Sequence, residues 1–116
     1  MKIRDIMEIL KARPLTKTIA GDLEVTCACA SDMMSDVLAF PKEDMVLLTG
    51  LTNPQVMRTC EMLDIEAVVF TRGKLPAQEA LDMAEENGIS VLATDYTLFI
   101  ASGILYSKGL TGSTKV

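Results

Sequence analysis

The spacing of apolar and polar residues in the first part of the chain predicts one helix followed by β-structure. Residues 2–11 place apolar side chains at helical spacing with charged side chains mostly opposite, which predicts an amphipathic helix that ends before Pro14. Residues 16–30 are rich in β-forming residues, with Gly21-Asp22 as a turn, and the alternation over residues 23–30 predicts a strand with one apolar face. That face carries Leu23, Val25, Cys27 and Cys29.

From residue 45 onward the chain repeats a strand–helix pattern three times. The runs 45–49, 67–71 and 89–94 are apolar at nearly every position, as strands of a parallel sheet are when helices cover both faces. A helix is predicted after each run, and Gly88 is a typical stop for the second of them. The predicted helix starts are Asn53–Pro54, Pro76 and Thr97.

Parallel strands joined by right-handed helical crossovers build layered α/β domains. The predicted fold class is therefore α/β, a three-layer α/β/α arrangement with a mostly parallel sheet. The 116 residues, of which 49% are apolar, suffice for one domain with its own core and are too few for two. We expect a single domain over residues 1–110 and a flexible tail over residues 111–116.

Net charge and cysteine spacing indicate which kinds of binding partner and which cellular compartment to expect. The formal net charge of −5 repels phosphate backbones and anionic lipid headgroups, so we expect neither nucleic acid nor a membrane as a partner. No segment has the pattern of a signal peptide or of a membrane-spanning helix. The three cysteines do not have the spacing of a disulfide framework, which favours a reducing cytoplasm.

The chain contains no histidine, the commonest general base and metal ligand in proteins. This absence lowers the expectation of catalysis, and we expect no enzyme activity, no cofactor and no metal. Cys27 and Cys29 supply two thiols, which are too few for a closed zinc site. We interpret these two residues and Cys60 as core packing.

The candidate binding residues follow the ends of the three predicted strands. In an open parallel sheet these ends meet at one edge, which is where ligands bind. Backbone N–H groups at helix starts attract anions, and two basic side chains add positive charge. The candidate ligand-binding residues are Thr49, Gly50, Asn53, Thr71, Arg72, Gly73, Lys74, Thr94 and Asp95. The same residue types cap helices and form turns in every fold of this class, so a structural role stays open.

A second polar cluster follows the β-rich segment. Residues 31–38 predict a short helix capped by Ser31 or Asp32. Asp32, Ser35 and Asp36 fall on one polar turn, where carboxylates can hold a cation or act as an acid–base pair. We favour helix capping and solvation as the explanation of this cluster.

The last predicted helix, residues 97–107, is apolar on several sides. Its large apolar side chains are Leu98, Phe99, Ile100, Ile104, Leu105 and Tyr106. Covering one side of a small sheet needs fewer of them, so we expect the remainder to form an exposed contact patch. We therefore predict a homodimer.

The second half of the chain also resembles a known family, the DRTGG domain. The family pattern is a hydrophobic strand that ends in a Thr-Arg-Gly or Thr-Gly-Gly turn, then a helix started by Pro, then a G-I-P-V-L-x-T strand. The matching residues here are 68–73, Pro76, 84–92, Thr94 and Thr97. Ser90 stands at the Pro position of the pattern. The layout of residues 2–107 is similar to this family and to the related N-terminal domain of HPr kinase/phosphorylase.

This resemblance implies an α/β domain like the N-terminal domains of Mur ligases such as MurF, with no established catalytic activity. Such domains tend to self-associate. They accompany other units, such as nucleotide-sensing CBS pairs in some inorganic pyrophosphatases, or a kinase domain. The active site of HPr kinase/phosphorylase belongs to a different domain, so the resemblance implies no kinase activity.

Three hypotheses for the function remain open. In the first, the chain is a non-catalytic regulatory domain that senses a small anionic or nucleotide-type ligand, such as a phosphorylated metabolite, as a homodimer. In the second, it is a protein–protein interaction or adaptor module of a redox or signalling complex encoded nearby, without a small-molecule ligand. In the third, it is a small enzyme that uses Asp32, Asp36 or Asp95. We favour the first two.

Overall fold

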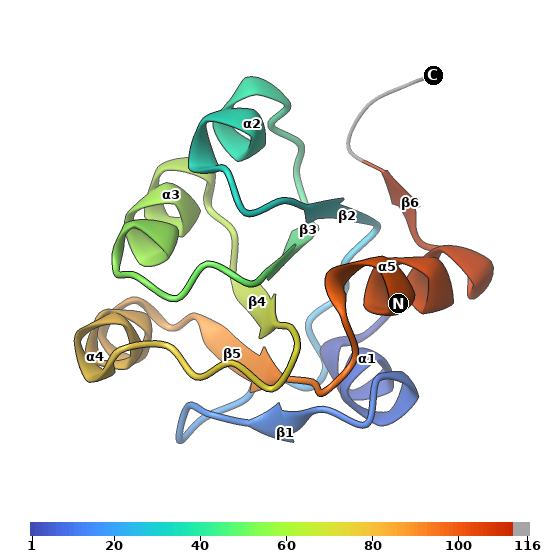
Figure 1. The fold of residues 1–116 in the computed structure, drawn as a ribbon, viewed down its shortest axis with the longest axis horizontal. Helices are drawn as coiled ribbons and strands as arrows, with labels where there is room; N and C mark the ends of the chain where they lie inside the picture. Colours follow the sequence, from blue (N-terminus) through green and yellow to red (C-terminus); the bar gives the residue numbers. More distant parts are fainter. Residues whose placement is uncertain (113–116) are drawn as a thin grey trace.

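The computed structural model describes residues 1–112 and contains a six-stranded sheet in the order β1-β5-β4-β3-β2-β6 (Figure 1). The strands are β1 (Arg13–Pro14), β2 (Cys27–Ala30), β3 (Met45–Thr49), β4 (Ala67–Phe70), β5 (Ser90–Ala93) and β6 (Thr111–Gly112). Neighbouring strands are parallel except β1 and β5, which are antiparallel. The helices are α1 (Ile3–Ile9), α2 (Met34–Ala39), α3 (Gln55–Leu63), α4 (Gln78–Asn87) and α5 (Leu98–Ser107).

Helices cover both faces of this sheet. α2, α3 and α4 lie on one face, and α1 and α5 lie on the other (Figure 1). Successive side chains of β3 point to opposite layers, so Leu47 packs with the α2–α4 cluster while Val46 and Leu48 pack with the α1–α5 cluster. The predicted three-layer α/β/α fold with a mostly parallel sheet is confirmed.

The central strands are buried along their whole length. Every residue of β3, β4 and β5 is buried. This burial explains why these segments are apolar without alternation, because helices exclude water from both faces. The three predicted strands are confirmed, although β4 and β5 end one residue earlier than predicted, at Phe70 and Ala93.

The turn predicted at Gly21-Asp22 is present, but the strand predicted after it, over residues 23–30, is confirmed only in its second half, because only Cys27–Ala30 form β2. The predicted single apolar face is wrong. Leu23 and Val25 pack in the α1–α5 cluster, whereas Cys27 and Cys29 pack in the α2–α4 cluster. The alternating pattern arises because the loop before β2 packs its apolar side chains, Leu23 and Val25, against α1.

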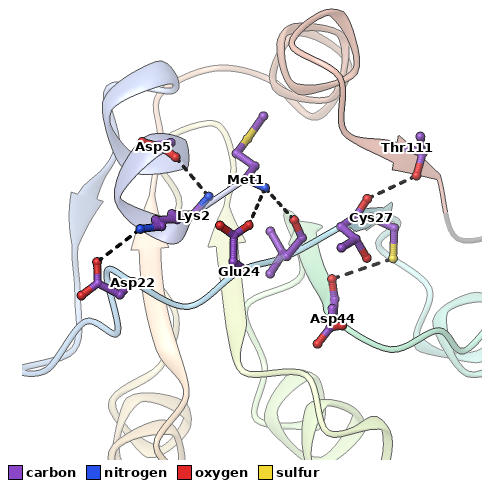
Figure 2. Close-up of polar contacts among 10 residues, drawn as sticks. Met1, Lys2, Asp5, Asp22, Glu24, Cys27, Asp44 and Thr111 are labelled. Carbon is purple, nitrogen blue, oxygen red and sulfur yellow. Dashed lines mark hydrogen bonds and ion pairs between the residues drawn. The ribbon is translucent and has the colours of Figure 1, made fainter.

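The N-terminal segment is held at the amino edge of the sheet. The Met1 ammonium group donates to the Glu24 carboxylate and to the Val25 carbonyl oxygen, each at 3.0 Å (Figure 2). Beyond α1, Arg13 and Pro14 pair with β5 at an edge of the sheet, where a proline is tolerated because no second neighbour needs its missing N–H. The sequence pattern had identified Pro14 only as the end of a helix.

Helix boundaries follow the predicted signals with small shifts. α3 begins one residue later than predicted, with Pro54 rather than Asn53 as its N-cap, and Asn53 Oδ1 accepts from Gln55 N at 2.8 Å just before it. α5 begins after Thr97, whose hydroxyl accepts from Ile100 N. The helix predicted over residues 31–38 begins later, at Met34, and neither Ser31 nor Asp32 is its N-cap. α4 begins two residues after the predicted start at Pro76. It ends as predicted at Gly88, which has the left-handed backbone conformation.

Part of the expected C-terminal tail is a strand. Thr111 and Gly112 pair with Cys27 and Ala28 as β6, and the Thr111 hydroxyl donates to the Thr26 carbonyl oxygen at 3.2 Å (Figure 2). The rest of that tail, residues 113–116, lies outside the described residues. None of the helices among residues 1–112 is both long enough and apolar enough to span a bilayer.

Replacing Thr59 by Val is expected to stabilise the fold. Thr59 is fully buried in α3, and its hydroxyl has no hydrogen-bond partner among residues 1–112. Valine has the same shape and removes the cost of an unsatisfied buried hydroxyl, so the free energy of unfolding should rise by about 1 kcal/mol. Urea denaturation measures this change. Thr59→Ser is the control, because it keeps the hydroxyl and loses a methyl group, and it should destabilise. A Val variant no more stable than the parent would contradict the assignment.

Candidate functional site

The carboxyl ends of β2, β3, β4 and β5 form one edge of the sheet, which we call the rim. The parallel register sets Thr49 beside Phe70 and Phe70 beside Ala93, so the predicted strand ends lie side by side. Hydrogen bonds continue this register past the strands: Thr71 N donates to Thr49 O at 3.0 Å, and Thr94 N donates to Phe70 O at 2.9 Å. The structure therefore brings the three threonines to one edge.

The rim contains the topological switch point of the sheet. The chain leaves β4 towards α4 on one face and leaves β5 towards α5 on the other (Figure 1). Open α/β sheets bind ligands where neighbouring strands send their connections to opposite faces. The loops concerned are 71–77 after β4 and 94–97 after β5.

The loop after β4 is tight and is tied to the loop after β5. Arg72 and Gly73 both have a positive φ, of 58° and 66°. Arg72 N donates to Tyr96 O at 2.7 Å, and Gly73 N donates to Thr94 O at 2.8 Å. A Cβ at position 73 would lie 3.0 Å from Asp95 Oδ1, so glycine suits both the backbone conformation and the space. The side chains of Arg72 and Lys74 are exposed above this pinned backbone.

The hydroxyl groups of Thr49 and Thr94 are used inside the protein. Thr94 Oγ1 donates to Leu10 O at 2.7 Å and accepts from Tyr96 N at 3.3 Å. Thr49 Oγ1 donates to Asp32 Oδ1 at 3.2 Å and accepts from Leu51 N at 3.1 Å. These two threonines therefore shape the rim, and its outward polar groups come from other residues.

Asp32 belongs to the rim, which the sequence analysis did not predict. Its carboxylate accepts from Gly50 N at 2.6 Å. A Cβ at Gly50 would lie 3.4 Å from Asp32 Oδ1 and 3.6 Å from Thr71 Oγ1, so three strand ends converge at this point. The signal available in the sequence was that Asp32 closely follows a β-forming segment; in the structure it lies two residues past β2, as Arg72 and Asp95 lie two residues past β4 and β5.

Arg13 is the second rim residue that the sequence analysis missed. It pairs with Ala93 in the β1–β5 register, and its guanidinium group lies 3.4 Å from Asp95 Oδ1. Positive side chains at the rim are thus Arg13, Arg72 and Lys74, and the negative ones are Asp32 and Asp95. The rim is slightly positive on a chain whose net charge is −5. No sequence pattern indicated that Arg13 lies on a strand beside β5.

The two rim carboxylates lie far apart. Asp32 follows β2 and Asp95 follows β5, with β3 and β4 between them. Three strand spacings separate them by about 14 Å. A pair acting directly on one bond needs a separation of ~5–9.5 Å. Asp36 lies on α2, which covers one face of the sheet. Asp32 and Asp95 therefore do not form a pair that could act on one bond.

Cys27 and Cys60 lie in the hydrophobic core, and Cys29 packs against it. Burial raises the pKa of Cys60 to about 12 and also raises the pKa of Cys27. The pKa of the half-buried Cys29 is raised by burial and by the nearby charge of Asp36. Thiols with raised pKa values are poor nucleophiles and weak metal ligands near neutral pH. Among residues 1–112, no group of three or more Cys, Asp or Glu side chains is arranged to hold a metal ion.

A separate apolar groove lies between α5 and the β2–β6 edge. Its volume is about 330 Å³. The prominent side chains beside it are Phe99 and Tyr106, which are 83% and 73% exposed. Its floor is formed by Ala28, Leu48 and Leu110. The expected exposure of part of the last helix is thus observed.

A further hollow of about 540 Å³ lies at the amino edge, away from the rim. Leu23, Met45 and Leu63 contribute apolar surface to it. Its acidic side chains are Glu24, Glu43, Asp44, Asp64 and Glu66, and Lys42 is also present. This hollow is larger than the apolar groove, but its charge makes it unsuitable for an anionic ligand.

Comparisons with known proteins support the fold. Neither the protein-family models nor the curated proteins contain a match to this chain. Among solved structures, the chain is similar to the CBS and DRTGG domains of the regulatory region of Clostridium perfringens pyrophosphatase, crystallised with its activator diadenosine tetraphosphate. The TM-score is 0.71 at 19% sequence identity. The match covers 97% of this chain and 48% of that chain, so this chain spans about half its length.

Proposed function

We propose that this chain is a non-catalytic regulatory domain of the DRTGG type, which binds a small anionic or nucleotide-type ligand at the rim and acts as a homodimer. The observation that carries the proposal is the switch point between β4 and β5, where Arg72 and Lys74 are exposed over a rim that also contains Arg13. A regulatory region with a similar fold contains a bound nucleotide activator, which supports this class of ligand. The resemblance to HPr kinase/phosphorylase stays a prediction.

The rim suits phosphate groups for a physical reason. Arginine and lysine side chains form charge-assisted hydrogen bonds with phosphate oxygens, and the hydrogen-bonded loop presents Arg72 without the cost of ordering the loop backbone. The negative potential expected of a chain with a charge of −5 would repel an anion from most of the surface. A ligand would therefore be attracted to the few places where positive side chains gather.

A ligand at the rim has a direct route to α5. The loop that carries Arg72 is hydrogen-bonded to Thr94 and Tyr96, and α5 begins at the N-cap Thr97 directly after them. A shift of this loop would therefore move the first turn of α5, which carries the exposed Phe99. Coupling of this kind is what a regulatory domain requires, because the ligand must favour one of two arrangements.

Removing the two exposed rim charges is expected to weaken nucleotide binding. We would screen diadenosine tetraphosphate, ATP and inorganic phosphate by thermal shift with the parent chain. A ligand at 100 times its Kd adds about 2.7 kcal/mol, or roughly 10 °C for a chain of this size. Arg72→Gln and Lys74→Gln should each weaken binding by at least about tenfold, because each removes a charge-assisted hydrogen bond.

Lys42→Gln is the matched control, since Lys42 is an exposed lysine at the amino-edge hollow, at the opposite end of the strands from the rim. It should leave the thermal shift unchanged. Equal losses in all three variants would point to general electrostatics and contradict a site at the rim. The absence of any shift with the three probes would favour the second candidate function.

That second candidate is a protein–protein interaction module without a small ligand. Two observations favour it. The polar groups of the rim largely satisfy one another, as in the contacts of Asp32 with Gly50 and of Asp95 with Arg13. The groove beside α5 is apolar and flanked by exposed aromatic side chains, as in protein-binding surfaces.

A further inference from the structure

Helix α5 carries no charged residue on any side, although it lies at the surface. Its sequence is LFIASGILYS, and its inner face supplies the buried Ala101 and Leu105. The outer face carries Phe99, Gly103 and Tyr106 at the i, i+4, i+7 spacing of one helical stripe, all exposed. A helix that is apolar all round is normally covered on both sides, so the outer face of α5 is expected to have an occupant.

We propose that this occupant is α5 of a second copy, packed antiparallel about a two-fold axis that passes between Ser102 and Gly103. This inference rests on the homodimer of the proposed function and names the surface that forms it. In this register Phe99 lies opposite the partner's Tyr106, and Tyr106 lies opposite the partner's Phe99. Ser102 and Gly103 lie where the two helices cross, and their small side chains allow the helices to approach closely.

The surface is self-complementary, as a two-fold interface must be. Phe99 and Tyr106 project from the helix, and hollows flank it on both sides. One is the groove of about 330 Å³ towards the β2–β6 edge, and the other, of about 400 Å³, lies towards Ile100 and Ile104. A projecting aromatic side chain of one copy therefore finds a hollow on the other copy. Gly103 lines both hollows, and a Cβ built there would meet no atom within 4 Å.

Charge favours this occupant over a membrane or a charged partner. Two copies, each with a net charge of −5, repel each other least where their contact surface carries no charge, and α5 is such a surface. Membrane-surface helices carry Lys and Arg on their polar face, which α5 lacks.

The exposed apolar area is of the size that a dimer needs. A phenylalanine or tyrosine has ~150–250 Å² to bury, so Phe99 and Tyr106 together expose roughly 300 Å² per copy. A standard interface buries about 800 Å² per partner. The two aromatic side chains thus supply more than a third of this area, and Ile100, Ile104 and the groove floor extend the surface.

Gly103→Glu is the variant that tests the pairing. It removes no contact within one copy, has open space for its Cβ, and places two carboxylates at the crossing point. Sedimentation equilibrium should show a dimer for the parent chain and an increase of at least ~30-fold in the dimer Kd for the variant, as for a hot-spot residue. Phe99→Ser serves as a second variant should Gly103→Glu fail to fold. Met62→Glu is the matched control, because Met62 is 64% exposed on α3 across the sheet, and it should leave the dimer intact.

Engineered cysteines test the register. Under a thiol oxidant, a mixture of the Phe99→Cys and Tyr106→Cys chains should form a disulfide-linked dimer, while either chain alone and the parent should not. A parent chain that is monomeric at 100 μM, or a dimer that Gly103→Glu and Phe99→Ser leave unchanged, would overturn the inference. Nucleotide binding at the rim is read separately by thermal shift of the Gly103→Glu chain, so loss of pairing and loss of ligand binding are distinguished.

Discussion

Deletion of residues 98–107 is expected to leave a chain that aggregates or does not fold. These residues are α5, which buries Ala101 and Leu105 completely and covers one face of the sheet together with α1. Without α5 the side chains of Val46 and Leu48 on that face would meet water. Each large apolar side chain that loses its burial costs about 1.5–3 kcal/mol, so Val46, Leu48 and the deleted Leu105 together represent a loss of roughly 5–9 kcal/mol. A domain of this kind has a stability of ~5–15 kcal/mol in total.

Size-exclusion chromatography and far-UV circular dichroism of the deleted chain measure this outcome. Gly103→Ala is the control, because it keeps α5, places its Cβ in open space and should remain folded. A soluble, folded monomer after the deletion would show that α1 alone covers this face of the sheet. It would also contradict the view that α5 has an inner face needed for folding and an outer face used for association.

Thr94→Val is expected to lower the free energy of unfolding by about 2–3 kcal/mol. Thr94 is fully buried, and its hydroxyl joins the carbonyl oxygen of Leu10 to the N–H of Tyr96. Valine keeps the shape but leaves both backbone groups without this partner, and an unsatisfied buried group costs ~1–3 kcal/mol. The same contact fixes the loop after β5 to the end of α1, so the variant should also loosen the rim.

Thr94→Ser is the matched control, since it keeps the hydroxyl and loses one methyl group, which costs about 1 kcal/mol. Guanidinium denaturation of the parent and the two variants gives the comparison. If Thr94→Val lowers the free energy of unfolding no more than Thr94→Ser does, the Thr94 hydroxyl does not stabilise the contact between α1 and the rim. Hydrogen exchange at the Arg72 and Gly73 amides should be faster in the valine chain, because their acceptors lie in the loop that Thr94 holds.

The second half of the fold was predictable because its signals are local. Apolar runs of the length of a strand, helix-start signals at Asn53-Pro54 and Thr97, and the stop at Gly88 identify strands and helices without knowledge of their neighbours. Each helix returns the chain to the start of a parallel strand, so the carboxyl ends of these strands meet at one edge. For this reason Thr49, Thr71 and Thr94 were expected at one edge, and the structure places them there.

The first half was predicted less well because its order depends on distant contacts. The segment before Cys27 is held by bonds to the N-terminus, such as Val25 N to Met1 O. β1 exists only because β5 offers an edge to Arg13 and Pro14. Alternation of apolar residues is the same for a strand and for a loop laid against a helix, so the pattern alone did not separate them.

The sequence by itself determined the layer architecture, the strand ends that meet at the rim and the excess of apolar surface on the last helix. These follow from local spacing and chain direction. Only the tertiary structure decided that Asp32 and Arg13 join the rim, that Thr49 and Thr94 turn their hydroxyls inward, and that Phe99 and Tyr106 stay exposed. The physical reason is that hydrogen-bond partners and burial depend on which segments become neighbours, and residues 17 to 84 positions apart in the sequence make these contacts.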